Sequence, residues 1–369
     1  MHKILLVGGA GYVGSVLAHE LLERGYAVRV LDRLFYGDQG LVPIRDRIEL
    51  IVADMRQVQA SHLSGVDAVI NVGGLSNDPT AEYNPTANYE MNTTAAVRLA
   101  ELCRAAGVRR YVLASSCSIY DPGVSDDQRD LIFDEEAEVS PRAAYATSKY
   151  EAEQRLLAMA AADFCPVILR KGTVFGFSSR LRFDLVVNTF VKDALTTGTI
   201  VLFRGGEMWR PLIDVHDVAR AYIACVSADE PLVRAQIFNV AYCNMRISEL
   251  ALRVRTTLRE LGVTVDIRAD YAYRGVRSYR VSTQKIERVL AFKAVVSVED
   301  AVRDLVEQLR RCKLEDLNHP KYANIRWLRV LEEAEAILGT GRSVFDAPAE
   351  AHATRLAVAA ARRPERREV

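Results

Sequence analysis

The amino-acid sequence predicts an α/β fold with a doubly wound parallel sheet and a smaller C-terminal lobe. Half of the 369 residues are hydrophobic and 26% are charged, the composition of a compact chain with a large buried core. In the first half of the chain, short runs rich in Val, Ile and Leu alternate with longer segments of helical periodicity. A glycine-rich turn joins the first of these runs directly to the first helical segment.

The predicted strands are nearly continuous in apolar residues, as strands buried on both faces should be. They are Lys3–Val7, Ala27–Leu31, Glu49–Val52, Ala68–Val72, Tyr111–Ser115 and Val167–Arg170. Helices are predicted over Tyr12–Arg24 and Asn88–Ala106, each followed by a glycine suited to the C′ position, and over Ala143–Ala161. Four more are expected at Asp184–Thr197, after Asp217, at Ser248–Leu261 and at Ile325–Leu338.

After Gly176 strand and helix patterns no longer alternate regularly, which predicts the domain organisation. Residues 1–176 form the main domain, to which the segment 212–245 returns, and residues 177–312 form the smaller lobe. Residues 313–369 are an extension whose end is expected to be disordered. Five arginines lie in its last part, diluted by alanine and glutamate, which is typical of a solvated terminus, so we assign them no role.

Composition excludes several classes of function. The 48 basic and 48 acidic residues cancel, which argues against nucleic acid or an anionic membrane as a partner. The six cysteines form no Cys-x-x-Cys pair and the histidines show no ligand spacing, so no metal site is expected. No apolar run approaches the roughly 20 residues that cross a bilayer. We therefore expect a cytoplasmic protein with reduced thiols.

The glycine-rich turn carries the first functional prediction. It reads Gly8-Gly9-Ala10-Gly11-Tyr12-Val13-Gly14 between a strand and a helix. Glycines there tighten the turn and let backbone N–H groups approach a pyrophosphate, while the helix N-terminus supplies positive potential. Gly8, Gly11, Tyr12, Val13 and Gly14 are therefore candidate dinucleotide-binding residues.

Residues at the ends of the next strands extend this site. Asp32 can accept both hydroxyls of an adenosine ribose and would repel a 2′-phosphate, which favours NAD over NADP, although the neighbouring Arg33 keeps NADP open. Asp54, with Met55 beside it, is expected to accept a hydrogen bond from the adenine amino group. Gly73-Gly74-Leu75 lets the backbone pass close to the cofactor.

A serine strand and a helix supply a candidate catalytic set. Tyr145 and Lys149 lie four positions apart on one helical face, and Ser116 follows the fifth strand. We expect the Lys149 ammonium and a positively charged nicotinamide to lower the pKa of the Tyr145 phenol, so that it removes a proton from a substrate hydroxyl that Ser116 holds.

With these residues, the sequence resembles the extended short-chain dehydrogenase/reductase family, in its NAD-dependent nucleotide-sugar epimerase/dehydratase branch. The resemblance spans roughly residues 1–312 and includes Trp209–Asp217, which is similar to the family's Arg-x-x-x-His-Val-x-Asp signature. It implies a Rossmann domain, a nucleoside-diphosphate sugar as substrate, and a homodimer formed through the helices 88–106 and 143–161. It makes Tyr145 the base, Lys149 the cation on the nicotinamide ribose and Ser116 the hydroxyl partner.

The resemblance also implies further binding residues. On the cofactor side they are Asn92, Ser115, Thr173 and Val174; on the substrate side they are Ser76, Ser116, Cys117, Ser118, Thr173, Arg182, Asn188, Arg210, Arg274 and Arg277. Arg210 would contact the substrate diphosphate, helped by an arginine of the segment 274–277.

Departures from the family pattern select among its reactions. Sugar 4,6-dehydratases of the family carry an Asp-Glu pair where this chain has Cys117 and Ser118, which disfavours dehydration. Lys171 replaces a usual proline, Thr173 a common asparagine and Asp214 the signature histidine. We therefore expect an NAD-dependent epimerase acting at carbon 4. The alternatives are an NAD(P)-dependent keto-sugar reductase, a 3,5-epimerase in which Cys117 is an acid/base, and a non-catalytic NAD-binding protein.

Overall fold

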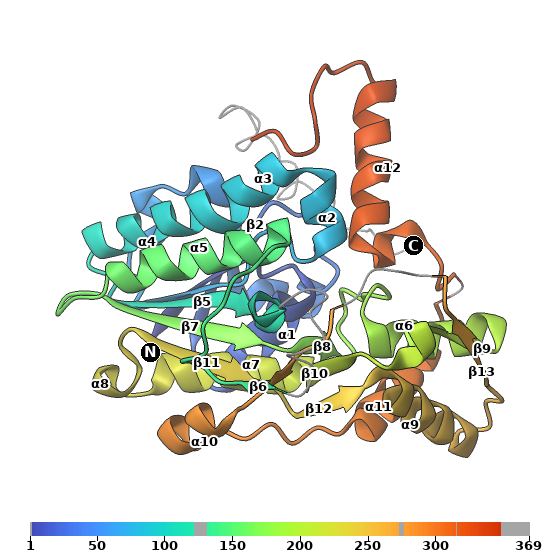
Figure 1. The fold of residues 1–369 in the computed structure, drawn as a ribbon. Coiled ribbons are helices and arrows are strands. Elements are labelled where there is room, and N and C mark those ends of the chain that lie inside the picture. Colours follow the sequence, from blue (N-terminus) through green and yellow to red (C-terminus); the bar gives the residue numbers. More distant parts are fainter. Residues whose placement is uncertain (1, 122–130, 273–276, 315, 348–369) are drawn as a thin grey trace.

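The computed structural model of the chain describes residues 2–121, 131–272, 277–314 and 316–347 (Figure 1). Its centre is a seven-stranded sheet in the order β11-β7-β5-β4-β1-β2-β3, in which every pairing is parallel. The strands are β1 (Lys3–Val7), β2 (Ala27–Asp32), β3 (Ile48–Val52), β4 (Ala68–Asn71), β5 (Arg110–Ser116), β7 (Cys165–Lys171) and β11 (Gln236–Val240). The predicted doubly wound sheet is confirmed, and β11, from the segment 212–245, joins its edge.

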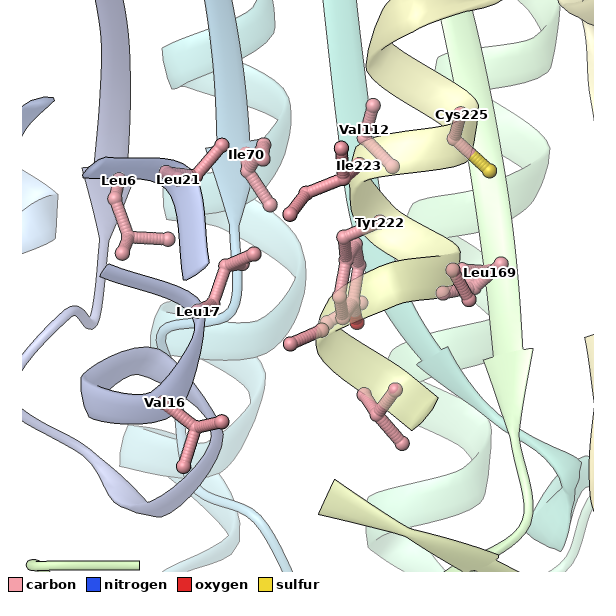
Figure 2. Packing of buried hydrophobic residues seen from close by; sticks show 14 of the residues in the cluster. Leu6, Val16, Leu17, Leu21, Ile70, Val112, Leu169, Tyr222, Ile223 and Cys225 are labelled. Atoms are coloured by element: carbon pink, nitrogen blue, oxygen red, sulfur yellow. The ribbon is translucent and has the colours of Figure 1, made fainter. Parts of the chain in front are cut away.

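Helices cover both faces of this sheet (Figure 1). Helices α1 (Tyr12–Glu23) and α7 (Val215–Ser227) pack on one face, and α4 (Ala95–Ala105) and α5 (Ala144–Ala158) pack on the other. Figure 2 shows the first of these interfaces, where Leu17 and Tyr222 from the two helices meet Ile70 and Leu169 of the sheet. Burial of these apolar side chains stabilises the sandwich by roughly 2 kcal/mol each.

Two helix predictions are wrong at their boundaries. The helix expected over Asn88–Ala106 is three pieces: α3 (Pro85–Tyr89), a π-helical turn (Glu90–Thr94) and α4. It begins earlier than expected because Asn84 caps the backbone N–H of Ala87. The helix expected after Asp217 begins at Val215, because the Asp214 side chain accepts a hydrogen bond from the His216 backbone N–H and caps it.

The smaller lobe has its own hydrophobic core. It contains a three-stranded sheet of β8 (Thr173–Phe175), β10 (Trp209–Asp214) and β12 (Cys243–Arg246) and a two-stranded sheet of β9 (Thr199–Phe203) and β13 (Asp266–Asp270). These sheets pack against α6 (Val186–Thr197), α9 (Ile247–Glu260) and α11 (Val298–Arg311). Shorter elements complete the chain: α2 (Asp78–Tyr83), β6 (Ile132–Phe133), α8 (Glu230–Val233), β14 (Arg280–Val281) and α10 (Gln284–Leu290).

The signature-like segment 209–217 holds the two parts together through buried hydrogen bonds. Asp217 is fully buried, and its Oδ2 accepts hydrogen bonds from the backbone N–H groups of Val295 and Val296 at 2.8 and 2.9 Å. Together with the Asp214 cap, this arrangement ties α7 to the segment that leads into α11. In this chain the two aspartates therefore have a structural role.

The C-terminal extension contains α12 (Asn324–Ile337), close to the helix expected at Ile325–Leu338. The predicted disordered end with its arginines, and positions 122–130, lie outside the described residues. Within the described ranges, no helix is long and apolar enough to cross a membrane, and no group of three or more metal-ligating side chains forms. All six cysteines are free thiols.

Candidate active site

The glycine-rich turn forms the floor of a cavity that runs along the carboxyl ends of the sheet strands. Gly8 has a φ of +80°, and a methyl group on it would lie 2.7 Å from the Cα of Gly73. A methyl group on Gly14 would collide with the carbonyl oxygen of Gly8. Only glycine allows these approaches, so the N-terminus of α1 faces an open, backbone-lined surface that fits a pyrophosphate.

Asp32 lies at the end of β2 and lines the same cavity. Its Oδ2 accepts a hydrogen bond from the Ala10 backbone N–H at 3.0 Å, and its Oδ1 accepts one from the Leu34 backbone N–H at 2.7 Å. The carboxylate is therefore fixed between the glycine turn and the loop after β2. A carboxylate oxygen accepts two hydrogen bonds, so each oxygen keeps capacity for a ribose hydroxyl.

Asp54 does not fit its predicted role as the acceptor for adenine. Its Oδ1 accepts hydrogen bonds from the backbone N–H and Nε of Arg56, and its Oδ2 accepts from Arg33 and from Arg56 Nη2, all at 2.9–3.0 Å. Four donors fill the carboxylate, whose pKa lies below its usual value because hydrogen bonds to Arg56 outweigh burial. Arg33 and Met55 line the cavity beside it.

Ser116 and Tyr145 meet at the other end of the cavity. Ser116 ends β5, Tyr145 lies in the first turn of α5, and their side chains are hydrogen-bonded to each other. Burial raises the pKa of the Tyr145 phenol to about 12, and the Ser116 hydrogen bond and the Arg182 charge offset this only in part. The structure of the chain alone therefore does not show the predicted lowering of the Tyr145 pKa by Lys149.

Lys149 is buried one turn further along α5. Burial and the like charge of Lys171 lower the pKa of Lys149 to about 7, and the charge of Glu153 offsets this only in part. Asn92 is close by in the π-helical turn: its Nδ2 donates to the Leu75 carbonyl oxygen at 2.9 Å, and its buried Oδ1 has no hydrogen-bond partner. A methyl group on Gly74 would lie 3.7 Å from Lys149 Nζ and would collide with Asn92 Oδ1, so Gly74, Asn92 and Lys149 lie next to one another.

Ser115, near the end of β5, and Cys117, at the start of the 3₁₀ turn that follows β5, both direct their side chains into the protein interior, which corrects two predictions. Ser115 is fully buried, and its hydroxyl donates to Glu153 beneath the cavity. Cys117 is also fully buried; its Sγ donates to the Arg170 carbonyl oxygen at 3.1 Å, and burial raises the pKa of its thiol well above 9. Because both side chains are fully buried and bonded to partners away from the cavity, the predicted roles of Ser115 in cofactor binding and of Cys117 in substrate binding or acid/base chemistry do not fit the structure.

A buried ionic network supports this end of the cavity from below. Arg170 Nη2 donates to Glu153 Oε2 at 2.6 Å, and Arg170 Nη1 donates to the Tyr120 hydroxyl at 2.6 Å. Tyr120 in turn donates to Asn239 Oδ1 at 2.8 Å. Glu153 is one turn after Lys149, so the network fixes α5 against the ends of β5 and β7.

Lys171 is a cavity residue that sequence reasoning did not assign to the site. It pairs in register with Ser116 across β5 and β7, and its Nζ donates to the Ser115 carbonyl oxygen at 2.9 Å. Burial lowers its pKa to about 8. The signal was available, because a lysine at the end of a strand buried on both faces must reach either solvent or a site.

The predicted substrate residues divide into three groups. Those that line the cavity are Ser76, Ser118, Thr173, Arg182 and Arg277, together with Ser116 and the cofactor candidate Val174. Ser118 Oγ is buried and has no hydrogen-bond partner, so it is a free donor and acceptor for a ligand. Arg182 is held by Asp184 at 2.8 Å, and Arg277 is paired with Asp78.

Besides Cys117, two predicted substrate residues lie away from the cavity, and Arg274 lies outside the described residues. Asn188 is fully buried, and it holds the loop after β8 by accepting from the Gly176 backbone N–H and donating to the Gly176 and Arg182 carbonyl oxygens, each at 3.0 Å. Arg210 Nη1 donates to the backbone carbonyl oxygens of Trp209 and Arg277. Arg274 falls in the range 273–276, which is not described.

Several lining residues come from distant segments that no local motif indicated. They are Phe35, Tyr36, Asn77, Asp78, Arg180, Leu185, Tyr279 and Asn324. Asn324 belongs to the C-terminal extension. Their placement depends on packing between segments hundreds of residues apart.

Comparison with known proteins agrees with this geometry. The chain matches the NAD dependent epimerase/dehydratase family over residues 4–241 and belongs to that family. NAD is the cofactor of the family. The chain is 28% identical over 254 residues to UDP-glucose 4-epimerase of Corynebacterium glutamicum, covering 64% of this chain and 74% of that protein.

Another relative has a different activity. The chain is 27% identical over 231 residues to UDP-glucuronic acid decarboxylase 1 of Xenopus tropicalis, covering 62% of this chain and 54% of that protein, so it spans about half the length of this relative. Among solved structures, MoeE5 in complex with UDP-glucose and NAD is 25% identical with a TM-score of 0.70, covering 85% of this chain and all (100%) of that chain. UDP-glucose 4-epimerase of Thermotoga maritima shares the fold with a TM-score of 0.74 at 21% identity, over 85% of this chain and 100% of its own.

Proposed function

We propose that this chain is an NAD-dependent nucleotide-sugar epimerase that inverts carbon 4 through a transient keto-sugar. The hydrogen bond between Ser116 and Tyr145 carries the proposal, because it lies at one end of a cavity whose other end holds the glycine turn and Asp32. The family and the named activities of its relatives support an enzyme acting on a nucleotide sugar.

Tyr145, Ser116 and Lys149 act together in one proton transfer. When bound, NAD supplies reversible hydride chemistry at the carbon that carries the hydroxyl. Tyr145, as phenolate, removes the hydroxyl proton and later returns it to the other face of the sugar, and Ser116 holds the oxygen in line. Lys149 binds the nicotinamide ribose, and its charge stabilises the phenolate. Since burial holds the pKa of Tyr145 at about 12 in the chain, formation of the phenolate requires the added positive charge of the bound cofactor.

We also propose a division of labour between the two parts, which most of the lining residues support. We assign residues 1–176, with the returning segment 212–245, to NAD binding and residues 177–312 to substrate binding. Arg182 and Arg277 lie on the substrate side and are suited to a diphosphate, while Ser118 offers a hydroxyl to the sugar. A homodimer through the helices of residues 88–106 and 143–161 stays part of the proposal.

The residues after Ser116 favour epimerisation over elimination of water. Cys117 points away from the cavity with a raised thiol pKa, and Ser118 is no acid at neutral pH, so neither position provides the acid/base pair that dehydration needs. The burial of Cys117 likewise argues against a 3,5-epimerase. A keto-sugar reductase would use the same Ser116, Tyr145 and Lys149 and is the second candidate.

Product analysis tests the proposal. Purified protein is denatured to identify any released dinucleotide by mass spectrometry, and native protein is incubated with UDP-glucose or UDP-glucuronic acid, with Tyr145→Phe as the control. We expect the C4 epimer with no net change in dinucleotide. Net consumption of dinucleotide would instead establish a reductase. Release of carbon dioxide or loss of a sugar hydroxyl would establish a decarboxylase or dehydratase and overturn the proposal.

A further inference from the structure

The C-terminal extension forms part of the cavity wall, although it lies beyond the segment that matches the family. We call residues 319–347 the clasp. It contains a 3₁₀ turn (Pro320–Tyr322), α12 and the segment that follows α12. Figure 1 shows α12 beside α2, and the two helices are in contact.

The clasp binds the main domain at the loop after β2. Trp327 Nε1 donates a hydrogen bond to the Phe35 carbonyl oxygen at 2.6 Å. Further along, Phe345 is buried in the core of the main domain, and its carbonyl oxygen accepts from Arg56 Nη2 at 2.7 Å. The Arg329 guanidinium lies 5.3 Å from the centre of the Tyr83 ring in α2. The clasp is therefore anchored at three separate points.

The clasp also reaches the loop that leads into the smaller lobe. Asn324 is 4% exposed, and its Oδ1 accepts from Arg180 Nη2 at 2.5 Å while its Nδ2 donates to Ser76 Oγ at 2.8 Å. Its backbone N–H donates to Asp184 Oδ2 at 3.1 Å. Tyr322, one turn earlier, accepts at its carbonyl oxygen from the Phe183 backbone N–H at 2.7 Å.

Both sets of contacts end at one place in the cavity. Trp327 holds Phe35, and Asn324 holds Arg180, whose guanidinium lies 3.9 Å from the centre of the Tyr36 ring. Phe35, Tyr36 and Arg180 line the cavity next to Asp32. In a Rossmann domain the acidic residue at the end of the second strand faces the adenosine ribose, so these residues surround the adenosine half of the dinucleotide.

We propose that Asn324 and Trp327 are cofactor-positioning residues, and that the clasp retains NAD by holding Phe35, Tyr36 and Arg180 around its adenosine half. The inference rests on the proposed function in one respect, the binding of NAD in this cavity, and it holds for any sugar. An enzyme that returns the hydride in each cycle gains from keeping its dinucleotide, because cofactor exchange has no part in such a cycle.

Variants in the full-length chain test the clasp. Asn324→Leu removes both side-chain hydrogen bonds at nearly constant volume, and Trp327→Leu removes the indole. Trp327→Phe keeps one aromatic ring and loses the N–H donor together with part of the indole volume. Ile337→Ser, at the 85% exposed end of α12, is the matched control. The measurements are NAD content after gel filtration, the dissociation rate of NAD by exchange with labelled NAD, and folding by circular dichroism.

We expect NAD dissociation to become about 10-fold faster in Asn324→Leu and Trp327→Leu, and a few-fold faster in Trp327→Phe, from the loss of one or two hydrogen bonds. Ile337→Ser should match the wild type. Folded variants that release NAD at the wild-type rate would overturn the clasp and leave the proposed function standing. Trp327→Phe is the milder change, since it keeps an aromatic ring in place, and so keeps the test decisive if the leucine variants misfold. A wild-type protein that binds no NAD would overturn both.

Discussion

The two ends of the cavity are built in different ways. The catalytic end, with Ser116, Tyr145 and Lys171, comes from β5, α5 and β7, which are consecutive in the sheet or packed on it, and the buried Arg170–Glu153 pair supports it. The adenosine end combines the loop after β2 with Arg180 and Asn324, segments separated by 144 or more residues. Chemistry therefore depends on local strand and helix geometry, whereas cofactor retention depends on long-range packing.

The largest expected effect is at the catalytic end. Tyr145→Phe should lower turnover by roughly 10³-fold, because it removes the group that takes and returns the proton, while NAD content stays at the wild-type level. Steady-state turnover and the dinucleotide released on denaturation check both halves. Near-normal turnover would show that Tyr145 is not the base.

The support beneath that end predicts a loss of stability. Glu153→Gln leaves the buried Arg170 guanidinium without its counter-charge, and the free energy of unfolding should fall by about 3 kcal/mol. Urea unfolding measures it. Glu151→Gln, on the exposed face of the same helix, is the control and should change stability by less than about 1 kcal/mol. Equal effects would mean that the buried pair contributes no special support.

The adenosine end should respond in binding and not in chemistry. Asp32→Ala is expected to weaken NAD binding by about 10-fold or more through the lost ribose hydrogen bonds and the freed Ala10 and Leu34 amides. Turnover at saturating NAD should fall far less than in Tyr145→Phe. Titration with NAD measures the affinity, and unchanged affinity would contradict the assignment of the ribose to Asp32.

The two lysines at the catalytic end predict a pH dependence of stability without added NAD. The pKa of Lys149 is lowered to about 7, whereas the same group in the unfolded chain titrates near 10.5. Between these values the unfolded state binds more protons, so stability should rise with pH from about 7 to 10.5, and Lys171 adds to the rise above about 8. Unfolding between pH 6.5 and 9.5 tests this. Lys149→Met should flatten the rise, and an unchanged slope would exclude Lys149 as its source.

The smallest expected effect distinguishes neighbouring residues of the catalytic end. Cys117→Ala should leave turnover within about twofold of the wild type, because the thiol points away from the cavity, whereas Ser116→Ala should lower it by roughly 10²-fold. Parallel kinetics of the two variants make the comparison. A large loss of activity in Cys117→Ala without loss of folding would restore its catalytic role.

Local rules of the sequence determined the sheet, the glycine turn and the Ser116–Tyr145–Lys149 set. Apolar strand runs, glycine spacing and a four-residue helical separation are properties of neighbouring residues. The structure contains the predicted sheet and helix, and it brings Ser116 and Tyr145 to one cavity. The same rules could have placed Ser115, because the period of two along β5 sends it to the opposite side from Ser116. That signal was present and was outweighed by the resemblance to the family.

Only the tertiary structure decided the remaining features. The structural role of Asp217 and the entry of Asn324 into the cavity each depend on a partner far away in the chain. Asp54 and Asn188 have nearer partners, but the hydrogen bonds that occupy them also form only once the loops around them have folded. A side chain's own type states what it can bind but not which donor or acceptor reaches it first. The packing of distant segments makes that choice, because it decides which donor or acceptor lies next to each buried polar group.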